Sequence, residues 1–467
     1  MSESEKKITV CLLNDSFPPL IDGVANAVVN YARILEEKYG HALVAAPSVP
    51  GADDSAFPFP VLRYPSIDTR KLVGYVAGYP FSPETAYRVR EEGVELLHLH
   101  CPVASAVLAR QLREAMDLPL VMTYHTKYDI DIANALHSKL LQEGAIAALL
   151  QNINACDEVW TVSRGAGENL RSLGYKGDYL VMENGVDLPR GRVSPAEIEA
   201  ATAGYDLPGG VPLFLFVGRI MWYKGLRIIL DALAALKAKG VDFRMGFIGS
   251  GSDSEAVQRC AQELGLTDRC FFTGAIGERE TLRAWYSRAD LFLFPSTFDT
   301  NGLVVREAAA CSLATVMIAG SCAAEGVTDG QNGFCIEENA PALAARLEAL
   351  CAAPEAMAEV GARAEQELYL SWEDAVGRAA ERYQVVLENY RRGLYRRRHS
   401  LRDEFLKSQG ELMEIMGKLG AARQEFLDEV RAGQEEVRQK RLAVQAETRE
   451  RLEKGRTAFL QHWDRYL

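Results

Sequence analysis

The chain has 467 residues, a formal net charge of −12 and nine cysteines. This length predicts about three domains of ordinary size, and the acidic balance argues against nucleic acid as a partner. The cysteines are odd in number and show no Cys-x-x-Cys spacing, which argues against a disulfide framework and a zinc site. No run approaches the roughly 20 apolar residues of a membrane span, and no apolar leader follows Met1. We therefore expect a cytoplasmic protein.

The first 190 residues alternate short apolar runs with amphipathic segments. Continuous apolar strands separated by helices are typical of a parallel sheet that is covered on both faces. We expect strands at residues 8–13, 42–46, 95–100, 120–125, 158–163 and 179–182. Residues 1–190 are thus predicted to form a doubly wound N-terminal domain, and the polar, turn-rich residues 189–207 are interpreted as a linker.

The same pattern then restarts, which predicts a second doubly wound α/β domain over residues 191–371. Its expected strands are residues 214–217, 244–248, 270–273, 291–294, 314–318 and 334–336. Ligands of open α/β sheets bind beyond the carboxyl ends of the strands. Residues 372–390 are predicted to form one last helix.

Residues 391–467 are predicted to form a long helical extension, because they lack proline and are rich in residues tolerant of helix. Apolar side chains recur at seven, which gives a short coiled-coil seam with a stutter before Val430. Gly417, Gly420 and Gly433 weaken one long helix, so two helices folded back as a hairpin are an equally allowed alternative. The basic run 391–398 fits contact with an anionic membrane, whereas the seam favours homo-oligomerisation or packing on the body.

Two short segments about eighty residues apart carry the clearest chemical signal. Gly218-Arg219 and Lys224 lie in a glycine-flanked turn, and an Arg fork with a Lys point charge is the usual pair for a diphosphate. Gly302 allows the backbone to pass close to a phosphate, and the helix expected after it directs N–H groups there. Glu307 falls in the first turns of that helix, where a carboxylate can accept two ribose hydroxyls.

These segments resemble retaining glycosyltransferases of family 4, which have the GT-B fold: two Rossmann-like domains with a cleft between them. The motif of that family is two acidic residues with seven between them and then Ala, and here it reads Asp299, Glu307 and Ala308. The first position is normally Glu, so Asp299 reaches one methylene less far. The resemblance covers about residues 8–390 and implies that the helix at 372–390 packs back on the N-terminal domain.

The resemblance also assigns roles to single residues. His125 is implied to lie beside the transferred sugar, where an imidazole hydrogen-bonds a hydroxyl and offsets developing positive charge. Gly23 is implied to let its loop touch the distal phosphate, and the backbone at Ile276 to face the base. The implied donor site comprises Gly23, Gly218, Arg219, Lys224, Gly249, Ile276, Asp299, Asn301, Gly302, Leu303 and Glu307. His125, Arg219, Lys224 and Asp299 are the residues implied in catalysis.

A metal site is also to be weighed, because Asp129-Ile130-Asp131 has the Asp-x-Asp form that metal-dependent glycosyltransferases of another fold use. That fold has a single nucleotide domain. Two sheets and an Arg/Lys clamp make a metal unnecessary, so we expect neither a metal nor a cofactor. His98 and His100 share one face of a strand but lack a third ligand, which favours packing or a role near the acceptor.

The resemblance implies a mechanism as well as a fold. No carboxylate is an obvious nucleophile for a double displacement, and the family account is a front-face substitution with retention. A hexose, most often glucose, would move from a UDP-sugar to a hydroxyl of an unidentified lipid or glycan. Two alternatives stay open: a non-catalytic scaffold or binding protein, and a phosphorylase on the same fold. A dinucleotide-dependent dehydrogenase is disfavoured, because no glycine fingerprint follows the first strand.

Overall fold

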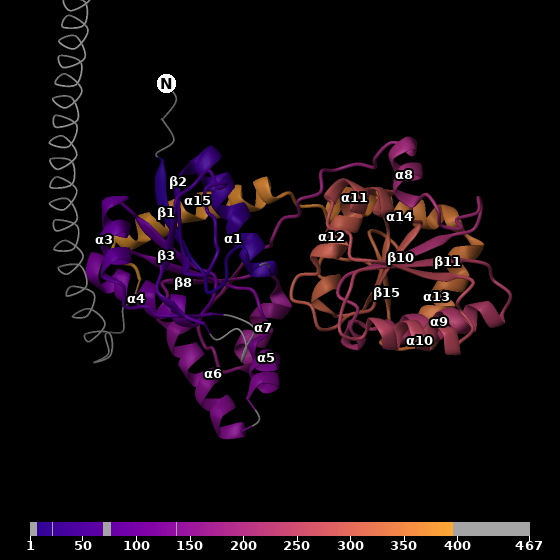
Figure 1. Ribbon diagram of the computed structural model, residues 1–467, viewed down its shortest axis with the longest axis horizontal. Coiled ribbons are helices and arrows are strands. Elements are labelled where there is room, and N and C mark those ends of the chain that lie inside the picture. The colour runs from indigo at the N-terminus through magenta and orange to yellow at the C-terminus, as the bar shows by residue number, and fades with distance from the viewer. Residues whose placement is uncertain (1–6, 21, 69–75, 137, 396–467) are drawn as a thin grey trace, which may run out of the picture.

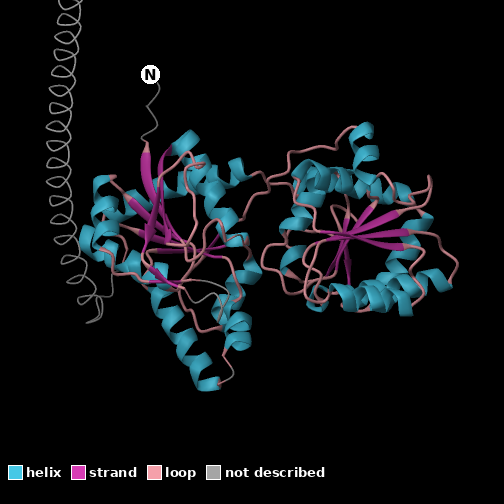
Figure 2. Cartoon of the chain, viewed as in Figure 1, coloured by secondary structure: helices cyan, strands magenta, loops and turns pink. Residues whose placement is uncertain are grey.

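The computed structural model describes residues 7–395 apart from residues 21, 69–75 and 137. Within these residues the chain forms two lobes, each built on a parallel sheet (Figure 1) with helices on both faces (Figure 2). The predicted pair of doubly wound domains is confirmed. The heptad seam and most of the basic run fall on residues 396–467, which lie outside the described residues.

The N-terminal lobe contains a seven-stranded sheet in the order β3-β2-β1-β6-β7-β8-β9, and every pairing is parallel. Its strands are β1 Ile8–Leu13, β2 Gly40–Pro47, β3 Val61–Tyr64, β6 Leu96–Leu99, β7 Leu120–Tyr124, β8 Glu158–Thr161 and β9 Leu180–Val181. A small antiparallel pair joins β4 Ser66–Ile67 to β5 Ala77–Gly78. The helices are α1 Gly23–Ile34, the π-helix η1 Leu35–Tyr39, α3 Pro83–Glu91, α4 Ala104–Met116, α5 Tyr128–Ala135, α6 Lys139–Asn154 and α7 Arg164–Ser172.

The second lobe contains a six-stranded parallel sheet in the order β12-β11-β10-β13-β14-β15. Its strands are β10 Leu213–Val217, β11 Arg244–Ile248, β12 Cys270–Gly274, β13 Leu291–Phe294, β14 Thr315–Ile318 and β15 Phe334–Ile336. Its helical segments are α8 Pro195–Thr202, η2 Trp222–Lys224, α9 Leu226–Ala238, α10 Ser254–Glu263, α11 Arg279–Arg288, α12 Leu303–Ala310, η3 Cys322–Ala324, α13 Ala340–Ala352 and α14 Pro354–Glu367. Every residue of β10 and β13 is buried, as their continuous apolar sequences require.

Residues 189–207, interpreted as a polar, turn-rich linker, contain a helix that was not predicted, α8. The Ser194 side chain caps the backbone N–H of Glu197, and the Glu197 carboxylate reaches back to the N–H of Ser194. This reciprocal capping box, with Pro195 at the first helical position, is a helix-start signal that was present in the sequence. The helix then packs on α11 of the second lobe.

The last described helix, α15 Trp372–Arg391, follows the second lobe in sequence but lies against the first (Figure 1). Tyr383 is fully buried there and stacks on Trp160, with ring centroids 5.4 Å apart. Its hydroxyl lies 2.6 Å from Nδ1 of His98. The expectation that the helix predicted at 372–390 packs back on the first lobe therefore holds.

The packing of α15 predicts a graded loss of stability at Tyr383. Tyr383→Phe leaves Nδ1 of His98 buried without a partner and should lower the free energy of unfolding by about 1–3 kcal/mol. Tyr383→Ala also leaves a cavity and should lower it by about 3–5 kcal/mol. Urea denaturation measures both, with Tyr390→Phe, a partly exposed position on the same helix, as a control expected to stay within about 0.5 kcal/mol. Equal losses in Tyr383→Phe and the control would contradict the assignment.

Candidate active site at the junction of the lobes

The predicted site residues follow the carboxyl ends of strands in both lobes. Gly218 and Arg219 follow β10, Asp299 follows β13, and His125 follows β7. In parallel sheets these ends share one edge, so residues far apart in sequence are gathered there. The two lobes touch at this edge, where Nζ of Lys127 donates to the carbonyl oxygen of Thr297 over 3.2 Å.

Glycine is required where the loops after β10, β11 and β13 cross one another. Gly249 has φ +137°, and a Cβ on it would lie 1.9 Å from the carbonyl oxygen of Gly218. Gly225 has φ +77°, and a Cβ on it would lie 2.0 Å from the carbonyl oxygen of Pro295. Gly249 was predicted to approach the nucleotide, but its first role here is to let two backbones cross. Close packing of these loops holds Arg219 at the end of β10.

The two predicted diphosphate cations lie in different environments. Arg219 is exposed and has no ion-pair or hydrogen-bond partner among the described residues. Lys224 is buried, and its Nζ lies 2.5 Å from Oδ1 of Asp299. The rings of Tyr223, Phe294 and Phe298 lie 5.5–6.0 Å from the same Nζ. A buried ammonium needs a counter-ion, and Asp299 supplies it.

Asp299 is held on its other side too, because the hydroxyl of Ser296 donates to its Oδ2 over 2.6 Å. Its side chain therefore bridges the end of β13 and the Lys224 turn. The sequence predicted one role for Asp299 on the sugar and another for Lys224 on the diphosphate. The structure adds that the two groups form an ion pair with each other.

The carboxylate of Glu307, the residue predicted to hold the ribose, is fixed by two side chains of α11. Arg279 donates to its Oε1 over 2.8 Å, and the hydroxyl of Tyr286 donates to its Oε2 over 3.0 Å. Burial and the neighbouring Glu307 carboxylate raise the pKa of Tyr286, so the phenol stays protonated. Sequence reasoning missed both partners. Their spacing of seven on α11, which places them on one helix face, was the available signal.

Gly302 adopts a left-handed conformation with φ +63° immediately before α12, and a Cβ on it would lie 2.8 Å from Cβ of Ala323. Leu303 is the first residue of α12. The side chain of Asn301 points into the first lobe, where its Nδ2 donates to the carbonyl oxygen of Val162 over 2.5 Å, and its Oδ1 is buried without a partner among the described residues. Asn301 therefore joins the lobes in this conformation.

The remaining predicted donor residues lie at the same edge but differ in what holds them. Gly23 begins α1, and Asp22 caps that helix by accepting from the N–H groups of Val24 and Ala25. An added Cβ on Gly23 would meet nothing within 4 Å, so the space beside it is open. Ile276, expected to present its backbone to the base, packs its side chain on the core of the second lobe.

On the first-lobe side, His125 is 6% exposed and its Nε2 lies 3.0 Å from Nδ1 of His100. Burial lowers the pKa of His125 to about 3. Burial and the neighbouring imidazoles lower the pKa of His98 and His100 well below the ordinary value. All three imidazoles are therefore neutral near pH 7, so His125 can act on a sugar as a hydrogen-bonding dipole.

Asp129 and Asp131 lie in α5. Oδ1 of Asp129 accepts from Nδ2 of Asn169 over 3.2 Å. Across the described part of the chain, no group of three or more His, Cys, Asp or Glu side chains is placed to hold a metal ion. None of the helices in that part is long and apolar enough to cross a bilayer.

Comparison with known proteins agrees with this arrangement. The family described as Glycosyltransferase Family 4 matches residues 21–190, and the family described as Glycosyl transferases group 1 matches residues 197–367. The two matches fall on the two lobes in turn and together span most of the chain. The chain is a GT-B glycosyltransferase of the family 4 type.

Individual relatives of this glycosyltransferase differ in what their names say they act on. The GDP-mannose-dependent alpha-mannosyltransferase of Corynebacterium glutamicum is 25% identical over 339 residues, 71% of this chain and 77% of that protein. The alpha-monoglucosyldiacylglycerol synthase of Streptococcus pneumoniae is 22% identical over 303 residues, 64% of this chain and 68% of that protein. Among solved structures, Anabaena HepE in complex with UDP-glucose superposes with a TM-score of 0.64 at 18% identity, over 81% of this chain and 100% of that chain.

A carboxylate of the second lobe also ties the lobes of this glycosyltransferase together. Glu325 accepts from the backbone N–H of Arg164 over 2.7 Å and from that of Gly165 over 2.5 Å. These are the first two residues of α7, where the helix dipole favours negative charge. Gly165 also lies so close to η3 that an added Cβ would come 2.5 Å from Sγ of Cys322. Glu325 and Gly165 thus form an interlobe latch.

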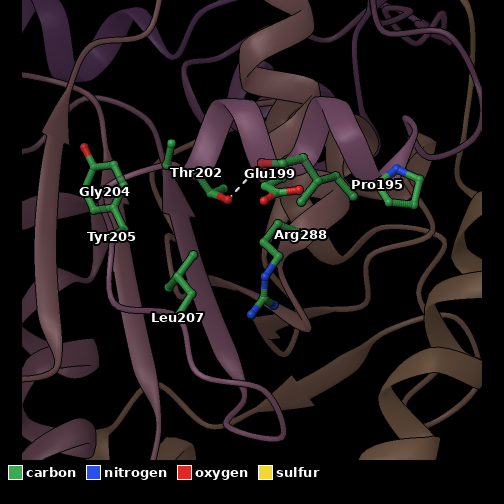
Figure 3. A pocket seen from close by; sticks show the side chains of 9 residues that line it. Pro195, Glu199, Thr202, Gly204, Tyr205, Leu207 and Arg288 are labelled. Atoms are coloured by element: carbon green, nitrogen blue, oxygen red, sulfur yellow. Dashed lines mark hydrogen bonds between the residues drawn. The ribbon is translucent and has the colours of Figure 1, made fainter.

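A hollow of about 370 Å³ lies beside α8 in the second lobe, and Figure 3 shows the side chains that line it. It is lined by Pro195, Ile198, Glu199, Thr202, Ala203, Gly204, Tyr205, Leu207 and Arg288. These residues come from α8, the segment after it and the end of α11, and none belongs to the predicted donor site. This hollow is therefore separate from the candidate active site.

The interlobe latch predicts that Glu325→Ala favours a more open molecule. Losing two charge-assisted hydrogen bonds should shift the closing equilibrium about tenfold. Gly165→Val should act in the same direction through steric overlap with Cys322. Small-angle scattering without ligand measures the radius of gyration, with Glu255→Ala, an exposed glutamate of the second lobe, as the control. An unchanged radius in both latch variants would contradict a closing role.

The three buried neutral histidines predict acid sensitivity. An imidazole whose folded pKa is depressed contributes stability above its unfolded pKa of about 6.5, and this is lost as pH falls towards the folded value. Each contributes a slope of up to about 1.4 kcal/mol per pH unit. His100→Phe removes one such group, so the slope of the free energy of unfolding between pH 6.5 and 5 should be smaller than in the wild type. Comparing slopes cancels carboxylates such as Asp15, whose pKa burial raises. Identical slopes would contradict the prediction.

Proposed function

We propose that this glycosyltransferase moves a hexose from a nucleotide diphosphate sugar to an acceptor hydroxyl with retention of configuration. One observation carries the proposal: Lys224 and Asp299, 75 residues apart, meet at 2.5 Å where β10 and β13 end. Arg219, which has no partner among the described residues, lies on the same loop as Lys224. An anion that enters here finds a cation that is exposed and a second one that can exchange its partner.

The pair between Lys224 and Asp299 suggests how donor binding proceeds. A diphosphate offers more negative charge than one carboxylate, so it takes over the ammonium of Lys224 and bonds the exposed guanidinium of Arg219. Asp299, still held by Ser296, is then released to accept from hydroxyls of the sugar. Donor binding and presentation of Asp299 are thereby coupled. Glu307, fixed by Arg279 and Tyr286, completes the site towards the ribose.

In the chemical step, the bond between the anomeric carbon and the diphosphate oxygen breaks while the acceptor oxygen bonds to the same face of that carbon. The leaving diphosphate oxygen takes the acceptor proton. Arg219, Lys224 and the first N–H groups of α12 stabilise the departing charge. The neutral imidazole of His125 hydrogen-bonds the sugar. Asp299, still held by Ser296, binds hydroxyls of the sugar and forms no covalent bond to it.

We propose UDP as the nucleotide, glucose as the first sugar to test, and no metal or other cofactor, because the Arg/Lys clamp supplies the positive charge. The acceptor is proposed to be a lipid or a glycan. The pneumococcal relative is named for a product that is a glucosylated diacylglycerol, and this name supports a lipid acceptor. Peripheral contact with an anionic membrane at the cytoplasmic face would follow from a lipid acceptor. Homo-oligomerisation through residues 391–467 stays a further proposal.

The donor clamp predicts that Arg219→Ala and Lys224→Met each lower kcat/KM by about 10²–10³. Transfer is measured with a panel of UDP- and GDP-sugars, after thermal shift has ranked which nucleotides stabilise the protein. Lys239→Ala, a surface lysine of the second lobe that pairs with Glu348, is the control and should keep wild-type turnover. Wild-type activity in both clamp variants would reject the donor site. Turnover that requires inorganic phosphate in place of a nucleotide would identify a phosphorylase.

A further inference from the structure

His98 in β6 and His100 directly after it make matched contacts with Thr123 in β7 and His125 directly after it. Nε2 of His98 lies 2.8 Å from Oγ1 of Thr123, and Nδ1 of His100 lies 3.0 Å from Nε2 of His125. Each partner is 25 residues further along the chain. The two strands are parallel with His98 opposite Val121, so each histidine meets the side chain two residues beyond its opposite position on the same face. The contact between His100 and His125 is therefore set by strand register.

The pair formed by His100 and His125 is covered by side chains of the first lobe. His100 is fully buried, and Tyr31 packs edge-on against its ring at 5.3 Å between centroids. Nε2 of His100 is buried with no partner among the described residues. Nδ1 of His125 likewise has no protein partner in the described part of the chain, but it is not fully enclosed. Only one of these two unpaired nitrogens can therefore reach a ligand.

The single hydrogen bond between two neutral imidazoles has two arrangements. If His125 donates from Nε2, then His100 carries its proton on Nε2 and leaves a buried N–H without an acceptor. If His100 donates from Nδ1, then only a lone pair is left unpaired on Nε2. Orphaned buried N–H groups are rarer and more costly than under-satisfied acceptors. The second arrangement is favoured, and it places the remaining proton of His125 on Nδ1.

We propose that His100 is a positioning residue, which donates from Nδ1 to Nε2 of His125 and so holds His125 in the tautomer that carries its proton on Nδ1. This inference rests on the proposed function, in which His125 bonds the transferred sugar. It adds that His125 donates a hydrogen bond from Nδ1 to a substrate oxygen. The side chain of His100 selects the tautomer that makes this possible. Neither nitrogen of His100 needs to touch the substrate.

The tautomer is read directly from intact protein labelled with ¹⁵N-histidine by long-range proton–nitrogen spectra. In the wild type, Nδ1 of His125 should appear protonated and Nε2 unprotonated, with the signals assigned by their loss in His125→Asn. His100→Phe keeps the ring volume but removes the donor, so His125 should shift towards protonation on Nε2. His100→Asn retains an amide donor at the same branch and should preserve the wild-type tautomer. His98→Gln, equally buried on the same strand, is the matched control and should also preserve it.

Kinetics provide the second readout. His100→Phe should lower kcat about ten- to a hundredfold while the donor KM stays within about twofold, and His100→Asn should recover most of the loss. A wild-type His125 protonated on Nε2, or an unchanged tautomer in His100→Phe, would overturn the inference. If His100→Phe does not fold, the wild-type spectrum and His100→Asn still decide. If no nucleotide sugar is turned over, the proposed function fails, whereas the spectra still settle the tautomer independently.

Discussion

A buried ammonium must have an anion within reach, and much of this active site follows from that constraint. Lys224 is enclosed by aromatic rings of its own lobe, and the loops after β10 and β13 bring Asp299 to it as the counter-ion. Gly225 makes this meeting possible, because any side chain there would collide with the backbone at Pro295. The short side chain of Asp299 fits the available distance. Asp299 in place of the usual Glu is thus compatible with the contacts to Lys224 and Ser296.

The two lobes are connected by more than the linker that joins them. The chain crosses back from the second lobe to the first at α15, where the hydroxyl of Tyr383 contacts the buried His98. The lobes meet again where Glu325 caps α7. A site between two lobes gains from such contacts, because closing excludes water from a reaction in which hydrolysis competes. Glu325 accepts hydrogen bonds from two backbone N–H groups at the start of α7, which belongs to the opposite lobe.

Sequence patterns were most reliable where burial is continuous. Runs such as residues 291–294 and 214–217 have no polar face, and a short apolar run between helices has few alternatives to a parallel strand. The same reasoning placed Arg219, Lys224, Asp299 and Glu307 at one edge, since each follows a strand. It missed the helix inside residues 189–207, where Ser194 and Glu197 form a capping box. Local hydrogen bonding decided that helix, and composition does not register it.

The sequence by itself determined the two doubly wound sheets, the edge at which the candidate site residues gather and the types of side chain found there. These follow from local periodicity and from the rule that parallel strands end together. Only the tertiary structure decided the partners: Asp299 on Lys224, Arg279 and Tyr286 on Glu307, His100 on His125. Each pairing depends on strand register, helix facing or a loop crossing over tens of residues. Distances of that kind are fixed by packing, and no single stretch of sequence encodes them.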